Sequence, residues 1–148
     1  FLAYQFTTDI NYSAATDFSE MSFVVPGPGA RDGLRKCFSD PGGLSEVDLI
    51  KLTTDRQQEE FDRLGLEFRS LWGRPLQLID CQNLFCEVDK YARAAHPHIP
   101  GLSGRTRIKQ KHRPNLEPIQ FFYPPKWGLN VRVEATLKEA KGKRAKGE

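Results

Sequence analysis

Hydrophobic residues that recur every three or four positions predict amphipathic helices along much of this chain. In residues 1–12, Leu2, Phe6 and Ile10 form one apolar stripe, which we expect to be buried. Gln5 and Asp9 would then lie on the polar face of the same helix. The first segment is therefore predicted to be a helix with one buried side.

Two more helices are predicted in the middle of the chain. Ser45 and Asp48 have the spacing of a capping box, which typically opens a helix. Residues 83–95 carry apolar side chains at helical spacing, and Pro97 ends the pattern. Residues 76–79 favour an extended and buried segment that leads into this helix. Asp80 would then lie just before the helix begins.

A proline- and glycine-rich turn, Pro26-Gly27-Pro28-Gly29-Ala30, leads directly into a helical pattern over residues 30–38. The pattern indicates a helix, a tight turn and a second helix. Backbone N–H groups at Gly27 and Gly29 can approach a phosphate closely, and the helix that follows adds the partial positive charge of its N-terminus. There are two alternatives to phosphate binding. In one, carbonyl groups of the turn hold a monovalent cation, and in the other the turn binds no ligand.

Proline and glycine are frequent after residue 97, so we expect little regular structure there apart from a short strand at residues 129–133. These patterns along the chain predict a mainly α fold in three parts. These are a helical domain over residues 1–113, an irregular extension packed on it over 114–137, and a disordered basic tail over 138–148.

The charge distribution divides the chain unevenly. Residues 1–102 hold ten Lys and Arg against fifteen Asp and Glu, whereas residues 103–148 hold twelve against four. The basic part begins at Arg105, Arg107 and Lys109, which are candidate ligands for a polyanion such as DNA. A solvated basic tail is the alternative.

Composition sets further expectations. The 148 residues suffice for one core, and the three cysteines show no zinc or disulfide pattern. No stretch approaches the roughly twenty apolar residues that span a bilayer, so we predict no membrane partner. We expect an intracellular protein, nuclear in a eukaryote and cytoplasmic in a bacterium or virus. The chain starts at Phe1 inside an amphipathic pattern, which indicates a fragment.

Acidic residues at the start of the helix over residues 83–95 are candidates for chemistry. A carboxylate at a helix start is held in its ionised form by free N–H groups, and beside a pocket it can orient an amine or stabilise positive charge. Asp80 is the first candidate and Glu87 the second. Asp80 as a simple helix cap, and a surface pair of Glu87 with Lys90, are the structural alternatives.

The order of these features, with a Pro-Gly hairpin first and then an apolar run that ends in an acid at a helix start, resembles that of helix-hairpin-helix DNA glycosylases. The distance from Ala30 to Asp80 is longer than in those enzymes generally, and the four-cysteine cluster loop of their endonuclease-III-like branch is absent. A closer resemblance covers almost the whole chain. It rests on the strings FLAYQ, DINYS, FVVPGPGA, GLRKCF, GRPLQLIDCQNLFCEVDKYAR and SGRTRIKQK. These resemble the helical domain of 5-hydroxymethyl-deoxyuridine DNA kinase, a family also called alpha-glutamyl/putrescinyl thymine pyrophosphorylases.

The resemblance implies a glycosylase-like helical domain that takes part in DNA base hypermodification. A 5-hydroxymethylpyrimidine is phosphorylated, and an amino acid or polyamine then displaces pyrophosphate. In this reading Asp80 or Glu87 accepts the amine proton. Arg105, Arg107 and Lys109 hold phosphates, and a flipped base meets polar and aromatic side chains of two helices, namely Gln5, Asp9, Tyr12, Gln82 and Asn83. We expect the hairpin and Asp80 to face the same cleft.

Two other functions are compatible with the sequence. One is base excision by a glycosylase mechanism, and the other is a DNA-binding module without catalysis that serves a fused or partner P-loop kinase. The chain lacks the G-x-x-x-x-G-K-[ST] motif, so we expect that it is not itself the kinase. The sequence requires no cofactor and predicts no metal site.

Overall fold

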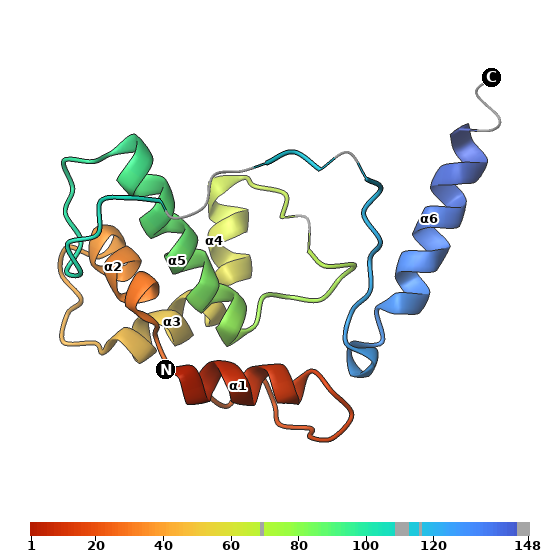
Figure 1. The fold of residues 1–148 in the computed structure, drawn as a ribbon, viewed down its shortest axis with the longest axis horizontal. Helices are drawn as coiled ribbons and strands as arrows, with labels where there is room; N and C mark the ends of the chain where they lie inside the picture. Colours follow the sequence, from red (N-terminus) through yellow and green to blue (C-terminus); the bar gives the residue numbers. More distant parts are fainter. Residues whose placement is uncertain (69, 109–112, 116, 145–148) are drawn as a thin grey trace.

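The protein is mainly helical, as predicted. The computed structural model describes residues 1–68, 70–108, 113–115 and 117–144, with side chains in the last helix described up to residue 139. Its helices are α1 (Leu2–Asn11), α2 (Pro28–Cys37), α3 (Glu46–Asp55), α4 (Gln57–Leu64), α5 (Leu78–Ala95), the short 3₁₀ helix η1 (Pro125–Trp127) and α6 (Asn130–Arg144) (Figure 1). No β-strand occurs in these ranges, where Leu71 and Arg74 form an isolated bridge.

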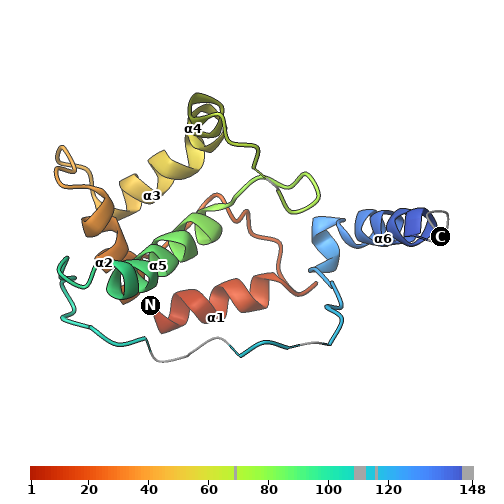
Figure 2. The ribbon, with the colours of Figure 1, turned by 90° about the horizontal axis from the view of Figure 1, so that it is seen from above.

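Helices α2 and α5 pack directly against each other at one end of the molecule (Figure 2), in the most extensive contact between the described helices. Their backbones come unusually close at Gly33, where an added Cβ would lie 2.0 Å from the carbonyl oxygen of Phe85. Only glycine permits this approach. Around the contact lies a core built from α1, α2, α3, α5 and the irregular segment before α2. It includes Tyr4, Val24, Ala30, Leu34, Leu49, Ile50, Leu78, Ile79, Cys81 and Phe85.

The capping box predicted before α3 is confirmed. Ser45 precedes the helix, its hydroxyl accepts a hydrogen bond from the Asp48 N–H at 3.2 Å, and its own N–H donates to the Asp48 carboxylate at 3.0 Å. These reciprocal bonds satisfy N–H groups that the helix leaves free.

Helix α5 begins earlier than the sequence predicted. Leu78 and Ile79 form the first turn of α5 instead of an extended segment. Asp80 is the third residue of the helix, whereas the sequence predicted that it would lie just before the helix. The physical reason is a cap one turn upstream, where the N–H of Gln77 donates to the Asp80 carboxylate at 2.8 Å. Both apolar residues still reach the core, but from a helix.

The buried face of α1 also differs from the prediction. Tyr4, Thr8 and Asn11 are buried, whereas Leu2 and Phe6 are 80% and 66% exposed. Tyr4 packs edge-on against Phe23 at 5.8 Å between ring centroids, and this contact orients α1 so that the face with Tyr4 is buried. Asn11 fixes the following loop, because its side chain both donates to the carbonyl of Phe18 and accepts from its N–H, each at 2.9 Å.

No helix directly precedes the hairpin, so the predicted unit of helix, tight turn and helix is wrong in its first part. Residues 12–27 are irregular, and α2 starts at Pro28 with an extended Gly27 as its N-cap. Pro26 and Pro28 explain the end of this segment, because each disfavours helical geometry in the residue before it. The helix predicted over residues 30–38 is confirmed as α2.

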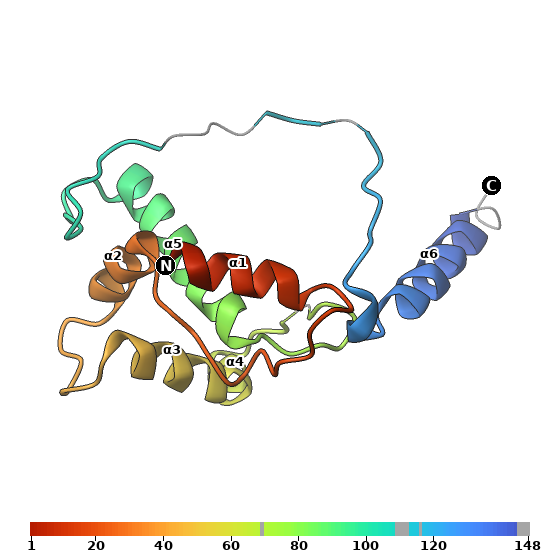
Figure 3. The same cartoon turned by 60° about the horizontal axis from the view of Figure 1, so that its bottom comes forward.

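The segment predicted as a strand at residues 129–133 is instead the start of α6. Leu129 and Val133 are buried and Val131 is 77% exposed, a pattern that a helix produces and a strand cannot. The helix projects from the side of the molecule (Figures 1 and 3). It includes residues 138–144 of the segment expected to be disordered, and residues 145–148 lie outside the described residues. None of the helices in the described ranges is long and apolar enough to cross a membrane.

Candidate nucleic-acid interface

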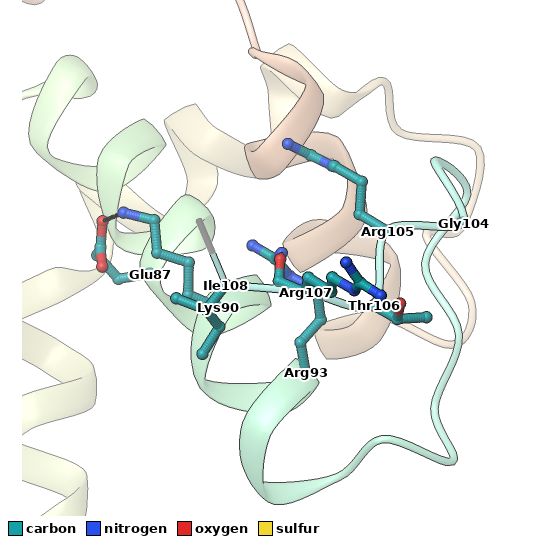
Figure 4. A pocket seen from close by; sticks show the side chains of 8 residues that line it. All are labelled: Glu87, Lys90, Arg93, Gly104, Arg105, Thr106, Arg107 and Ile108. Carbon is teal, nitrogen blue, oxygen red and sulfur yellow. Dashed lines mark hydrogen bonds and ion pairs between the residues drawn. The ribbon is translucent and has the colours of Figure 1, made fainter. Parts of the chain in front are cut away.

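A basic cavity of about 830 Å³ opens where the second half of α5 faces residues 104–108. Four cationic side chains and one carboxylate belong to its lining (Figure 4). The lining residues are Glu87, Lys90, Arg93, Gly104, Arg105, Thr106, Arg107 and Ile108. The predicted ligands Arg105 and Arg107 are thus brought together, while Lys109 lies outside the described residues.

The irregular segment that carries these arginines is fastened to two helices. On α5, the guanidinium of Arg93 donates to the carbonyl of Arg107. On α2, the buried carboxylate of Asp32 accepts hydrogen bonds from the N–H of Ser103, at 3.0 Å, and from its hydroxyl. Residues 103–107 therefore have a defined position although they form no helix or strand.

The hairpin glycines lie in different surroundings. A Cβ added at Gly29 would lie 3.3 Å from the Cys86 sulfur and 3.7 Å from a guanidinium nitrogen of Arg105. Gly29 is thus next to the basic segment. At Gly27, the same added atom would lie 2.5 Å from the ring of Phe1, so that ring covers the glycine.

Of the two predicted acids, Glu87 lies at the cavity. Its carboxylate accepts from Lys90 at 2.5 Å, as the i,i+3 spacing suggested, and its side chain is 64% exposed. This exposure leaves the Glu87 carboxylate accessible to solvent as well as to Lys90.

Asp80 does not line the basic cavity. It belongs to a second group, the aromatic clasp, which we define as Tyr12, Glu20, Arg74, Asp80 and Trp127. Arg74 is its centre, because its guanidinium pairs with Glu20 at 2.8 Å and with Asp80 at 3.3 Å. The same guanidinium stacks 3.9 Å from the centroid of a Trp127 ring. The indole N–H donates to Glu20 at 2.6 Å, which holds η1 on the domain.

Tyr12 packs edge-on against Trp127 in this clasp, with 5.4 Å between centroids. Burial, together with the nearby charge of Glu20, raises the pKa of Tyr12 to about 12. Tyr12 therefore serves as a packing residue of the clasp, and its hydroxyl stays protonated at neutral pH.

The other predicted base-binding residues are dispersed. Gln5 and Asp9 are exposed on α1, and Asn83 is exposed on α5. Gln82 is only 1% exposed, and its amide nitrogen donates to the Cys86 sulfur at 3.2 Å. Its carbonyl oxygen is buried without a hydrogen-bond partner among the described residues.

Sequence reasoning did not assign Arg93, Asp32 or Asp89 to the site. Asp89 and Arg93 are four residues apart and could have been recognised as an ion pair on one helix face. The contact of Asp32 with Ser103 spans 71 residues and has no local signal.

The three cysteines are all in the thiol form in this structure. Cys37, Cys81 and Cys86 form no disulfide. Burial raises the pKa of the Cys81 thiol, and the residue packs in the core. No group of three or more His, Cys, Asp or Glu side chains in the described ranges could hold a metal ion.

The fold and the cavity define a small helical domain with a cationic surface site. The chain belongs to the family described as "5-hmdU DNA kinase, helical domain", which matches residues 1–101. It is similar to a 5-hmdU DNA kinase of Bacillus phage SP10, with 32% identity over 76 residues, or 51% of this chain. That match covers 12% of the length of the phage protein. No solved structure matches the chain.

Proposed function

We propose that this domain binds DNA and takes part in hypermodification of a 5-hydroxymethyluracil-derived base. The basic cavity beside the start of α2 carries the proposal, because it gathers cationic side chains where the hairpin glycine Gly29 meets the basic segment. Membership of a family named for a kinase of 5-hmdU in DNA supports the choice of base. A glycosylase-like origin of the helical domain is part of the same proposal, with the Pro-Gly turn acting through the start of α2 alone because no helix directly precedes it.

The reaction proposed is transfer of an amine to an activated base. The amine nitrogen of an amino acid or polyamine attacks the methylene carbon attached to C5, the carbon–oxygen bond breaks, and pyrophosphate leaves with the bonding electrons. The amine loses one proton to a carboxylate. In this proposal Arg105 and Arg107 bind the pyrophosphate. Their presence in the lining of the basic cavity supports that role, because guanidinium groups bind phosphates through paired N–H donors. The activated base would be supplied by a P-loop kinase acting as partner or fused domain.

Glu87 is our first candidate for the proton acceptor. It shares the cavity with the arginines, whereas Asp80 is tied to Arg74 and to the backbone of Gln77. Asp80 would then have a structural role only, as the acidic partner of Gln77 in the capping box of α5.

The experiment compares Glu87→Gln with Asp80→Asn on DNA that contains pyrophosphorylated 5-hydroxymethyluracil, with a polyamine or amino acid as donor. Nucleoside mass spectrometry should detect amine addition by the wild-type protein. Glu87→Gln should lose most of this turnover and retain DNA affinity, and Asp80→Asn should retain both. Absence of both DNA binding and base modification in the wild type would refute the proposal.

The same assay separates the two alternatives. Release of a free base would show excision, which the glycosylase resemblance favours. DNA binding with no change of mass in any nucleoside would favour a module that delivers DNA to a kinase.

A further inference from the structure

Two buried carboxylates stand behind the arginines of the basic cavity, and the proposed reaction gives neither of them a role. Asp89 on α5 and Asp32 on α2 are each only 1% exposed. Burying a carboxylate is costly unless it is paired, and both are paired with cations at the cavity or behind it.

Asp89 forms an ion triad. Its carboxylate pairs with Lys36 of α2 at 2.8 Å, and the Lys36 side chain is 4% exposed. On its other side lies Arg93 Nε at 3.2 Å, from a side chain that is 9% exposed. The triad carries one net positive charge. The head of the Arg93 side chain extends from it to the cavity wall, where it donates to the Arg107 carbonyl.

Asp32 holds Arg105 in position. Besides its two hydrogen bonds from Ser103, it lies 3.5 Å from a guanidinium nitrogen of Arg105. Nε of Arg105 also donates to the Ser103 hydroxyl at 2.9 Å. The chain packs tightly here, since a Cβ at Gly101 would lie 2.8 Å from the carboxyl carbon of Asp32. Arg105 therefore projects from a rigid base while its side chain stays 40% exposed.

Charge and shape at the cavity indicate the ligand. Its lining holds three more cations than anions, and Asp32, Asp89 and Lys36 behind the wall leave an excess of two. A cavity of about 830 Å³ accommodates a phosphate chain as well as a single phosphate. Two arginines held at fixed positions suit a group with several equivalent oxygens, because each planar fork can bind two of them.

We propose that the basic cavity is a phosphoryl-binding site in which Arg93 and Arg105 contact the phosphoryl oxygens, with Asp89 and Asp32 as positioning residues. This inference rests on the proposed function and adds Arg93 and the two acids to it. The same chemistry is presented by a DNA backbone phosphate and by free pyrophosphate, and the test uses both as probes.

The first measurement uses the full chain with Arg93→Gln and, as a control, Arg63→Gln, which removes the same charge from α4 at a side chain that is 63% exposed. Inorganic pyrophosphate is titrated by calorimetry, and a fluorescent DNA duplex by anisotropy at several salt concentrations. Arg93→Gln should weaken binding about tenfold or more and reduce the slope of log affinity against log salt by about one. Arg63→Gln should change affinity less than about twofold.

The second measurement uses Asp32→Asn, whose expected effect has a diagnostic sign. This change makes the protein more positive, so a site that works by net charge alone would bind an anion more tightly. A positioning role predicts weaker binding, because Arg105 and Ser103 lose their anchor. Ser103→Ala keeps the charge and removes one anchoring hydroxyl, and it should weaken binding to a smaller extent. Arg93→Lys, which keeps the pairing charge in the triad, serves if Arg93→Gln does not fold.

Each result bears on the proposal. A loss of affinity in Arg93→Gln supports the site, whether it affects DNA alone, pyrophosphate alone or both. The pattern identifies which phosphate the site binds. Equal affinities for Arg93→Gln and Arg63→Gln with both probes would overturn it, as would tighter binding by Asp32→Asn. Pyrophosphate binding that depends on Arg93 in a protein that neither binds nor modifies DNA would retain the site and refute the proposed function.

Discussion

Replacing Gly33 by alanine should strongly destabilise the domain. The added Cβ would lie 2.0 Å from the Phe85 carbonyl oxygen and 2.7 Å from its carbonyl carbon. Both atoms belong to the backbone of α5, so no side chain can rotate away. Relief needs a shift of more than about 1 Å between α2 and α5, because non-bonded carbon and oxygen atoms approach only to about 3.3 Å.

The magnitude follows from two opposing effects. Alanine improves helix propensity by about 1 kcal/mol, while overpacking costs about 1–3 kcal/mol and more where backbone must move. A shift between the two helices would also separate the core residues Ala30, Leu34 and Phe85. We therefore expect a net loss of about 3 kcal/mol in the free energy of unfolding. At this chain length the melting temperature should fall by roughly 6–12 °C.

The assay is urea and thermal unfolding followed by circular dichroism. Gly29→Ala is the matched control on the same helix, because its nearest neighbour is the Cys86 side chain at 3.3 Å, which can adjust. The control should stay within about 1 kcal/mol of the wild type. A Gly33→Ala protein as stable as Gly29→Ala would refute the close contact between α2 and α5.

Three further predictions concern stability. Lys36→Met leaves Asp89 with a single cationic partner and should cost about 3–5 kcal/mol in urea unfolding, and a loss below about 1 kcal/mol would contradict the buried triad. Burial opposes ionisation of Asp32, but hydrogen bonds from Ser103 and the charge of Arg105 outweigh it and hold the pKa of that carboxyl below its ordinary value. Its stabilisation is therefore complete above about pH 4, the value in the unfolded chain, and is lost as pH falls through the lower folded pKa. Asp32→Asn should flatten the acid limb of melting temperature against pH, and an unchanged limb would argue against this. Burial raises the pKa of Tyr4 to about 12, so the stability it contributes is complete below about pH 10 and is lost as pH rises through 12. Tyr4→Phe should reduce the alkaline loss of stability measured by urea midpoints, and equal losses in both proteins would contradict the assignment.

Local signals in the sequence predicted α1, α2, α3 and most of α5 but not α6, and they did not show which face of α1 is buried. The spacing of Leu2, Phe6 and Ile10 correctly indicated a helix. The buried side was decided by Tyr4 against Phe23 and by Asn11 with the backbone of Phe18, which are tertiary contacts. For the same reason, a short apolar run in the sequence did not reveal whether it forms an extended segment or part of a helix.

The start of α5 and the start of α6 illustrate this ambiguity. Leu78 and Ile79 could belong to an extended run or to a first helical turn, and the cap at Gln77 decided between them. Leu129 and Val133 share a face in both a strand and a helix, and the exposure of Val131 distinguishes the two.

The candidate site was predictable in its charges and not in its assembly. The clustering of Arg105 and Arg107 could be read from the sequence, and the structure gives them Arg93 and Lys90 as neighbours. The separation of Asp80 from the cavity could not be read, because it depends on Arg74 and on Trp127, which lies 47 residues after Asp80 along the chain.

The most direct test of the account is hydrogen–deuterium exchange of the full chain, with and without a DNA duplex that contains 5-hydroxymethyluracil. If DNA enters the basic cavity beside the start of α2, backbone amides in residues 29–32 and 101–108 should gain protection, and those of α4 should not change. Protection confined to α1 or α4, with residues 101–108 unchanged at saturating DNA, would contradict it.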